Sequence, residues 1–116
     1  TELGLAPEVG SSYLLFQALG YQQAAQLLFQ SKIIDGTKYY ELGLAKYIGD
    51  DFLDQANSYA RDLKEQSLSS IIETKAILKS FMLEDLAKAR SMETKAMKKL
   101  FGSEDNLKAV EKFFNK

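Results

Sequence analysis

Residues 1–12 read TELGLAPEVGSS, and the interpretation of the whole chain starts from this stretch. The dipeptide Ala6-Pro7 predicts a tight turn, because proline fixes its own backbone angle and restricts the residue before it. A glycine and two serines follow and lead into an apolar run, a pattern that is typical of the start of a helix. Glu8 lies on this turn. A carboxylate at the start of a helix is held rigidly and can act on a bound molecule.

The composition limits the chemistry that the chain can perform. Its 116 residues are 46% apolar, which is enough for one hydrophobic core, and 15 basic residues nearly balance 16 acidic ones. Because there is no basic surplus, nucleic acid is not an expected partner. Cysteine and histidine are both absent, so carboxylates are the acid–base groups near neutral pH, and no metal site is expected. No apolar run approaches the roughly 20 residues that cross a bilayer. We therefore expect a cytoplasmic protein without a membrane span.

The spacing of apolar residues predicts a mainly helical chain with one or two short strands. The strand candidates are residues 3–5 and 44–48, and both lack an obvious partner. A fragment whose missing half supplies the sheet would explain them, because an unpaired strand leaves backbone groups unsatisfied. In the first half of the chain we expect helices over 11–19, which Gly20 ends, and over 21–30, followed by a helix that Asp35 or Thr37 opens and Gly43 stops. An apolar stripe predicts a further helix over 52–63. In the second half we expect a helix opened by a capping box at Ser70, a long amphipathic helix over 86–100, and a last helix after Ser103.

Five segments, in order along the chain, resemble the crotonase superfamily of enoyl-CoA hydratases and isomerases. LGLAPEVG at residues 3–10 is similar to the family's LGL-x-P-x-x-G segment at the active site. The other four segments are residues 20–28, 33–45, 70–78 and 103–105. Each match is weak alone, but five in the right order are a strong signal. One departure is Tyr39 or Tyr40 at a position where the family usually has alanine, which suggests altered packing.

The resemblance implies that this chain is the C-terminal portion of an α/β crotonase fold, with one structural unit. Residues 1–66 would end the core, and residues 67–116 would form a helical region used for active-site cover and oligomer contacts. Members of the family bind an acyl-CoA and polarise its thioester carbonyl with two backbone N–H groups from the N-terminal half. We therefore expect an acyl-CoA substrate, no separate cofactor, a need for the N-terminal half, and a homotrimer or hexamer in the intact protein.

Glu8 has two interpretations. On the residues alone, a glutamate just before a helix is favoured because it stabilises the helix dipole, by about 0.3–1 kcal/mol. The resemblance instead favours a catalytic base, because Glu8 matches the glutamate of L-x-P-E-x-G-S-S in the isomerase branch, where hydratases usually have glycine. A catalytic Glu8 is expected to have apolar neighbours, for which Val9, Tyr13 and Leu14 are the candidates.

The residues around Glu8 and at the end of the chain also carry expectations. Gly10 is expected to allow close backbone approach or an unusual backbone angle, and Ser11 and Ser12 to cap the helix. Four residues are candidate substrate contacts, with packing or a frayed terminus as the alternative role: Tyr13, Leu14, Phe113 and Lys116. Packing in the core is the favoured role for Tyr13, Leu14 and Phe16.

The resemblance leaves three functional hypotheses open. The first is an enoyl-CoA isomerase that shifts a beta,gamma double bond of an acyl-CoA into conjugation, with one glutamate as the proton shuttle. The second is an enoyl-CoA hydratase of the same family, which needs two glutamates because it must activate a water and deliver a proton. The third is a noncatalytic helical domain for oligomerisation or CoA binding.

Overall fold

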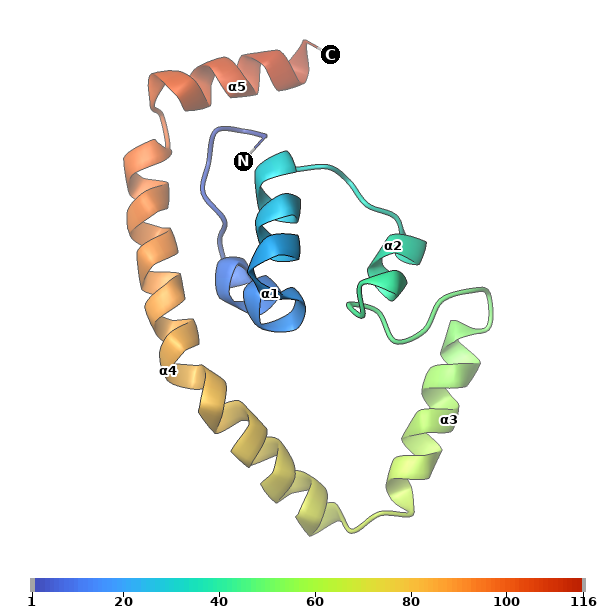
Figure 1. Cartoon of the computed structure of the whole chain (residues 1–116). Coiled ribbons are helices and arrows are strands. Elements are labelled where there is room, and N and C mark those ends of the chain that lie inside the picture. The colour runs from blue at the N-terminus through green and yellow to red at the C-terminus, as the bar shows by residue number, and fades with distance from the viewer. Residues whose placement is uncertain (1, 116) are drawn as a thin grey trace. The chain divides into compact units, whose positions relative to one another are not determined.

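The computed structural model describes residues 2–115 and contains helices connected by turns and irregular segments (Figure 1). Contacts divide the chain into two compact units, which we name the terminal unit (residues 2–33 and 84–115) and the middle unit (residues 34–83). The predicted difference in role between residues 1–66 and residues 67–116 stays a prediction. In chain order the helices are α1 (Ser11–Gln30), α2 (Gly36–Glu41), α3 (Phe52–Lys64), α4 (Leu68–Leu100) and α5 (Glu104–Phe114).

The predicted strands are wrong, because no residue of the described chain lies in a strand. The two candidate segments find other partners for their backbone groups. The Leu3 carbonyl accepts a hydrogen bond from Nδ2 of Asn106 at 2.7 Å. The N–H groups of Leu44 and Ala45 donate to the Tyr39 carbonyl at 2.9 and 3.2 Å, where α2 ends. Residues 44–45 therefore extend the end of α2, whereas the Leu3 carbonyl is satisfied by a side chain.

Several predicted helix boundaries are confirmed. Gly20 interrupts α1 with φ 73° and ψ 169°, which separates the two predicted helices. Asp35 caps α2 by accepting from the Lys38 N–H at 2.8 Å, and Ser103 caps α5 by accepting from the Asn106 N–H at 3.2 Å. These caps are local, so a short sequence window is enough to find them.

The start of α4 is a correction. The capping box predicted at Ser70 lies inside the helix, which begins at Leu68. Ser67 occupies the capping position, because its Oγ accepts from the Ser70 N–H at 3.4 Å. The helices expected around residues 70–78 and 86–100 are also one continuous helix of 33 residues.

The inner face of α4 agrees with the predicted apolar stripe of Leu86, Ala89, Met92, Ala96 and Leu100 at every position except Met92. The predicted stripe included Met92, but that side chain is 62% exposed, whereas Glu93 beside it is buried. Leu86, Ala89, Ala96, Met97 and Leu100 are half-buried on the same side as Glu93. A carboxylate therefore lies on the inner face of an amphipathic helix.

The expected hydrophobic core is sparse within the described chain. Ala24 is the one apolar side chain that is buried among residues 2–115, and Leu14 and Phe16 are exposed, which corrects their expected place in the core. Tyr13 is half-buried. Two polar side chains, Glu93 and Asn106, are buried instead. Both bind backbone groups of the N-terminal segment, residues 2–10, or of the first turn of α1. In the terminal unit this segment passes beside the second half of α4 and beside α5 (Figure 1).

Gly10, just before α1, has no room for a side chain. Its φ is 84°, and a Cβ atom there would overlap Cδ1 of Leu86 on α4, so that this side chain would have to shift. The predicted close approach and unusual backbone angle at Gly10 are thus both confirmed.

We expect Gly10→Ala to destabilise the complete protein more than Gly102→Ala does. Both positions have a positive φ, so alanine is strained at each by about 1–2 kcal/mol, but nothing lies within 4 Å of a Cβ at Gly102. At Gly10 the Leu86 side chain must also shift, and an off-rotamer side chain costs about 0.5–1.5 kcal/mol. Thermal unfolding of the two variants measures the difference, and equal midpoints would contradict the close packing of Gly10 on Leu86.

Candidate active site

The turn that carries Glu8 has a strained backbone. Val9 and Gly10 both adopt left-handed angles, with φ of 61° and 84°. A β-branched residue such as valine rarely adopts this conformation, which costs on the order of 1–3 kcal/mol and recurs at functional sites. The Glu8 carbonyl accepts from the Ser11 N–H at 3.0 Å, which closes the turn onto α1. The Val9 side chain is 76% exposed, so burial of its own apolar surface contributes little to this conformation.

Glu93 binds the far side of this turn from α4. One carboxylate oxygen, Oε2, accepts from the Gly10 N–H at 2.6 Å. The other, Oε1, accepts from the N–H of Ser12 at 3.0 Å and from its hydroxyl at 2.5 Å. Glu93 is 6% exposed, so these bonds are shielded from water. Charge-assisted bonds of this kind are about twice as strong as neutral ones.

The carboxylate of Glu93 supplies hydrogen-bond acceptors to the first turn of α1. That turn contains no acidic residue, and its capping residue Gly10 makes no side-chain hydrogen bond. The free N–H groups and the positive end of the helix dipole therefore meet a negative charge supplied by another helix. Burial by itself raises the pKa of Glu93, but the hydrogen bonds from Ser12 and Gly10, with the nearby Arg90 charge, outweigh it and hold the pKa below 4.5.

The prediction that Ser11 and Ser12 cap α1 is wrong. Gly10 occupies the capping position, Ser11 is the first helical residue, and the Ser12 hydroxyl donates to Glu93. Sequence reasoning missed Glu93 because it lies 81 and 83 residues away from its partners. The available signal was a single glutamate among the apolar residues of the face that α4 buries.

Glu8 lies at the edge of two hollows in the terminal unit. The first, of about 410 Å³, has a mixed lining of charged side chains, which include Arg90, Glu93 and Lys98, and apolar ones. The second, of about 690 Å³, is mainly apolar and includes Leu5, Met97 and Phe101. The Glu8 side chain is exposed. A molecule with an apolar chain and a polar group could thus contact Glu8 from either side.

The predicted substrate contacts have different positions. Phe113 lines the larger hollow together with Glu8, so the structure brings these two together. Its ring packs edge-on against Phe114, with centroids 5.6 Å apart. Tyr13 and Leu14 line neither of the two hollows at Glu8. Lys116 lies outside the described residues.

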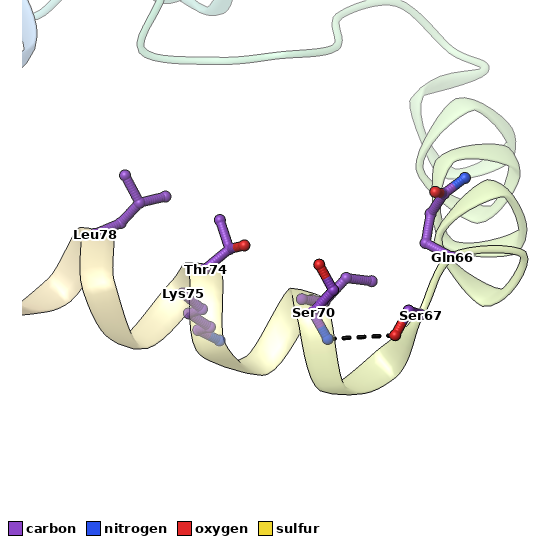
Figure 2. Close-up of a pocket in the computed structure, with 7 residues that line it drawn as sticks. Gln66, Ser67, Ser70, Thr74, Lys75 and Leu78 are labelled. Atoms are coloured by element: carbon purple, nitrogen blue, oxygen red, sulfur yellow. Dashed lines mark hydrogen bonds between the residues drawn. The ribbon is translucent and has the colours of Figure 1, made fainter.

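A third hollow, of about 400 Å³, lies in the middle unit where α3 is followed by α4 (Figure 2). Its lining includes Ser67, Ser70 and Thr74, with the hydrogen bond between Ser67 and Ser70 at one side (Figure 2). Lys75 is the charged residue of this lining, which holds no carboxylate. Acid–base chemistry therefore points to Glu8 and the terminal unit.

Residues 2–115 contain no group of three or more acidic, histidine or cysteine side chains arranged to hold a metal ion. Among the helices of this part of the chain, none combines the length and apolar character needed to cross a membrane.

The chain is similar in sequence and in structure to several known proteins. No protein-family model matches it. YhaR of Bacillus subtilis, named as an enoyl-CoA hydratase/isomerase, is 28% identical over 98% of this chain and 45% of its own length. The relatives of this chain are enoyl-CoA hydratases/isomerases. An enoyl-CoA hydratase/isomerase structure from Acinetobacter baumannii is 31% identical over 91% of this chain, with a TM-score of 0.77. OdaA of Pseudomonas aeruginosa is 29% identical over 99%, with a TM-score of 0.83.

The comparisons also bear on the fold. These structural relatives have the crotonase fold, so the expected likeness to a portion of that fold is confirmed, whereas the short strands are not. The chain spans 45% of YhaR, 45% of the Acinetobacter protein and 48% of OdaA. It therefore corresponds to less than half of each relative.

We expect Glu93→Gln to lower stability near neutral pH by roughly 1.5–3 kcal/mol, because an amide cannot accept all three hydrogen bonds. Folding lowers the pKa of Glu93, so its charged form contributes stability that is present above 4.5 and is lost as the pH falls through the folded value. The difference in free energy of unfolding between wild type and variant should shrink in acid. Denaturant titrations over a pH series measure this difference. A difference that stays constant in acid would argue against a stabilising role for the charged carboxylate of Glu93.

Proposed function

We propose that the complete protein carrying this chain is an enoyl-CoA isomerase that moves a beta,gamma double bond of an acyl-CoA into the alpha,beta position. The observation that carries the proposal is the placement of Glu8. Its exposed carboxylate lies on a strained turn, at the edge of a mainly apolar hollow and of a second hollow that also contains charged side chains. The names of the relatives, enoyl-CoA hydratase/isomerase, support this reaction class.

In the proposed reaction Glu8 carries one proton between two carbons. Its carboxylate removes a proton from the alpha carbon, and the electrons of that C–H bond spread over the thioester carbonyl and the existing double bond. The protonated Glu8 then returns the proton to the gamma carbon, which leaves the double bond between the alpha and beta carbons. One base is sufficient because no atom is gained or lost.

The reaction has one further requirement that the described contacts do not supply. Negative charge develops on the thioester oxygen, and preorganised N–H donors are the usual way to stabilise it. The family resemblance implies that two backbone N–H groups in an N-terminal half do so. We therefore propose that Glu8 acts together with residues from the part of its relatives that this chain does not match.

A hydratase of the same family is the second candidate, and one comparison favours it. An enoyl-CoA hydratase structure from Bacillus halodurans is 26% identical over 95% of this chain, with a TM-score of 0.82. Hydration adds water across a conjugated double bond and so removes the absorbance that isomerisation creates. A single assay with both substrates separates the two reactions.

A noncatalytic helical domain is the third candidate. Large apolar side chains are exposed in the described part of the chain, with Ile33, between α1 and α2, at 99% and Phe114, at the end of α5, at 79%. Surfaces of this kind mark contact with another part of a protein or with a second copy. In this third candidate, such contacts join the chain to the rest of a homotrimer or hexamer, and Glu8 is only a helix-start residue.

We expect Glu8→Gln in the complete protein to reduce the rate of the double-bond shift by roughly 10²–10⁴-fold, because glutamine cannot accept the proton. The rise in absorbance of the conjugated thioester measures the rate, and binding of a saturated acyl-CoA should be unchanged. Glu111→Gln, an exposed change on α5, is the matched control with wild-type activity. Full activity of Glu8→Gln would show that Glu8 is a helix-start residue and overturn the proposal.

We expect the 116-residue chain alone to show no turnover of a beta,gamma-enoyl-CoA. Loss of even one oxyanion donor costs about 3 kcal/mol, and the chain lacks the proposed donor segment. Its exposed apolar side chains should also cause self-association. Light scattering and the absorbance assay test both points. Measurable turnover, or a clean monomer at high concentration, would contradict the corresponding expectation.

A further inference from the structure

The contacts of Glu93 fix the backbone on which Glu8 stands. One residue, Val9, separates Glu8 from Gly10, and it is held at φ 61°. A valine in this conformation would relax to a negative φ if its surroundings allowed it. The 2.6 Å bond from the Gly10 N–H to Glu93 and the packing of Leu86 against Gly10 oppose that relaxation. The strain at Val9 is thus maintained by α4.

Glu93 and Glu8 share a hollow but differ in their bonding. Both line the smaller hollow, of about 410 Å³, together with Val9. The Glu93 carboxylate is buried and accepts three hydrogen bonds, so it is committed to the turn. The Glu8 carboxylate is exposed, and no hydrogen bond to it occurs among the described residues. Glu93 is therefore committed to the backbone of the turn, whereas the Glu8 carboxylate is accessible to a bound molecule.

We infer that Glu93 is a positioning residue for the double-bond shift, holding Gly10 and Ser12 so that Glu8 stays at the edge of the hollows. The inference rests on the proposed function of Glu8. Glu93 touches neither the substrate nor the reacting carbons in this scheme. It acts through the turn, and a small displacement of a catalytic group can lower a rate by about 10²-fold.

A substitution at Ser12 tests the role of Glu93 with a smaller change. Its hydroxyl donates one of the three hydrogen bonds to Glu93, and its N–H and that of Gly10 donate the other two. Ser12→Ala removes the hydroxyl bond alone and leaves both backbone bonds in place. Its effect on the position of Glu8 should therefore be in the same direction as that of Glu93→Gln but smaller.

The experiment measures kcat and KM for a beta,gamma-enoyl-CoA with the complete protein and its variants. We expect Glu93→Gln to lower kcat at least about tenfold and to change KM less than about threefold, because a misplaced base affects the transition state more than substrate binding. Ser12→Ala should lower kcat about threefold, with KM unchanged. Glu84→Gln is the matched control, an exposed glutamate on the same helix, and should retain wild-type constants.

The outcomes separate this inference from the proposed function. A folded Glu93→Gln variant with kcat within about twofold of wild type would overturn the positioning role, as would a loss confined to KM. If Glu93→Gln does not fold, Ser12→Ala decides, and an unchanged kcat overturns the inference. If Glu8→Gln is inactive while Glu93→Gln is fully active, the inference fails and the proposed function stands. If Glu8→Gln is fully active, the proposed function itself fails.

Discussion

The bond between the Glu93 carboxylate and the first turn of α1 is the interaction on which the terminal unit depends. A buried carboxylate is costly unless its oxygens are hydrogen-bonded, and a helix start is costly when its N–H groups have no partner. Here the N–H groups of Gly10 and Ser12 and the Ser12 hydroxyl donate to the Glu93 carboxylate, so the carboxylate and the helix start satisfy each other. Removing either side leaves the other unsatisfied, so the contribution is larger than that of an exposed ion pair. The partners lie 81 and 83 residues apart, so the bond forms only once α4 has packed on α1.

Asn106 has the same role at the other end of the N-terminal segment. Its Nδ2 donates to the Leu3 carbonyl, and its Oδ1 accepts from the Gly102 N–H at 2.9 Å. The segment from residue 2 to residue 10 has no regular secondary structure, so side chains must satisfy its backbone groups. Two buried polar residues therefore hold this segment against α4 and α5. The hollows at Glu8 are bounded by the segment and these helices.

Local signals in the sequence predicted the local structure well. The breaks at Gly20 and Gly43 and the caps at Asp35 and Ser103 need only a few neighbouring residues, and the structure has each of them. The start of α4 was placed at Ser70 because Ser70 and Glu73 have the spacing of a capping box, while Ser67 binds the Ser70 N–H. The strands were predicted from alternation alone, which cannot show whether a partner strand is present.

Long-range contacts account for what the sequence did not reveal about the site. The turn of residues 6–10 and its glutamate were found from Pro7 and Gly10, and Phe113 does share a hollow with Glu8. Nothing near Ser12 in the sequence points to Glu93, so the two serines were interpreted as caps by default. A glutamate on the buried face of α4 is visible in the sequence, but its partner is defined only by the packing of α1 on α4.

The most direct test of this account is the amide proton resonance of Gly10 in the complete protein, compared between wild type and Glu93→Gln by nuclear magnetic resonance. A 2.6 Å bond to a buried carboxylate should shift the wild-type resonance strongly downfield, and the substitution should move it and that of Ser12 upfield. The wild-type resonance should also titrate at a pH below 4.5. A Gly10 amide that is unaffected by the substitution would show that Glu93 does not hold the turn of Glu8.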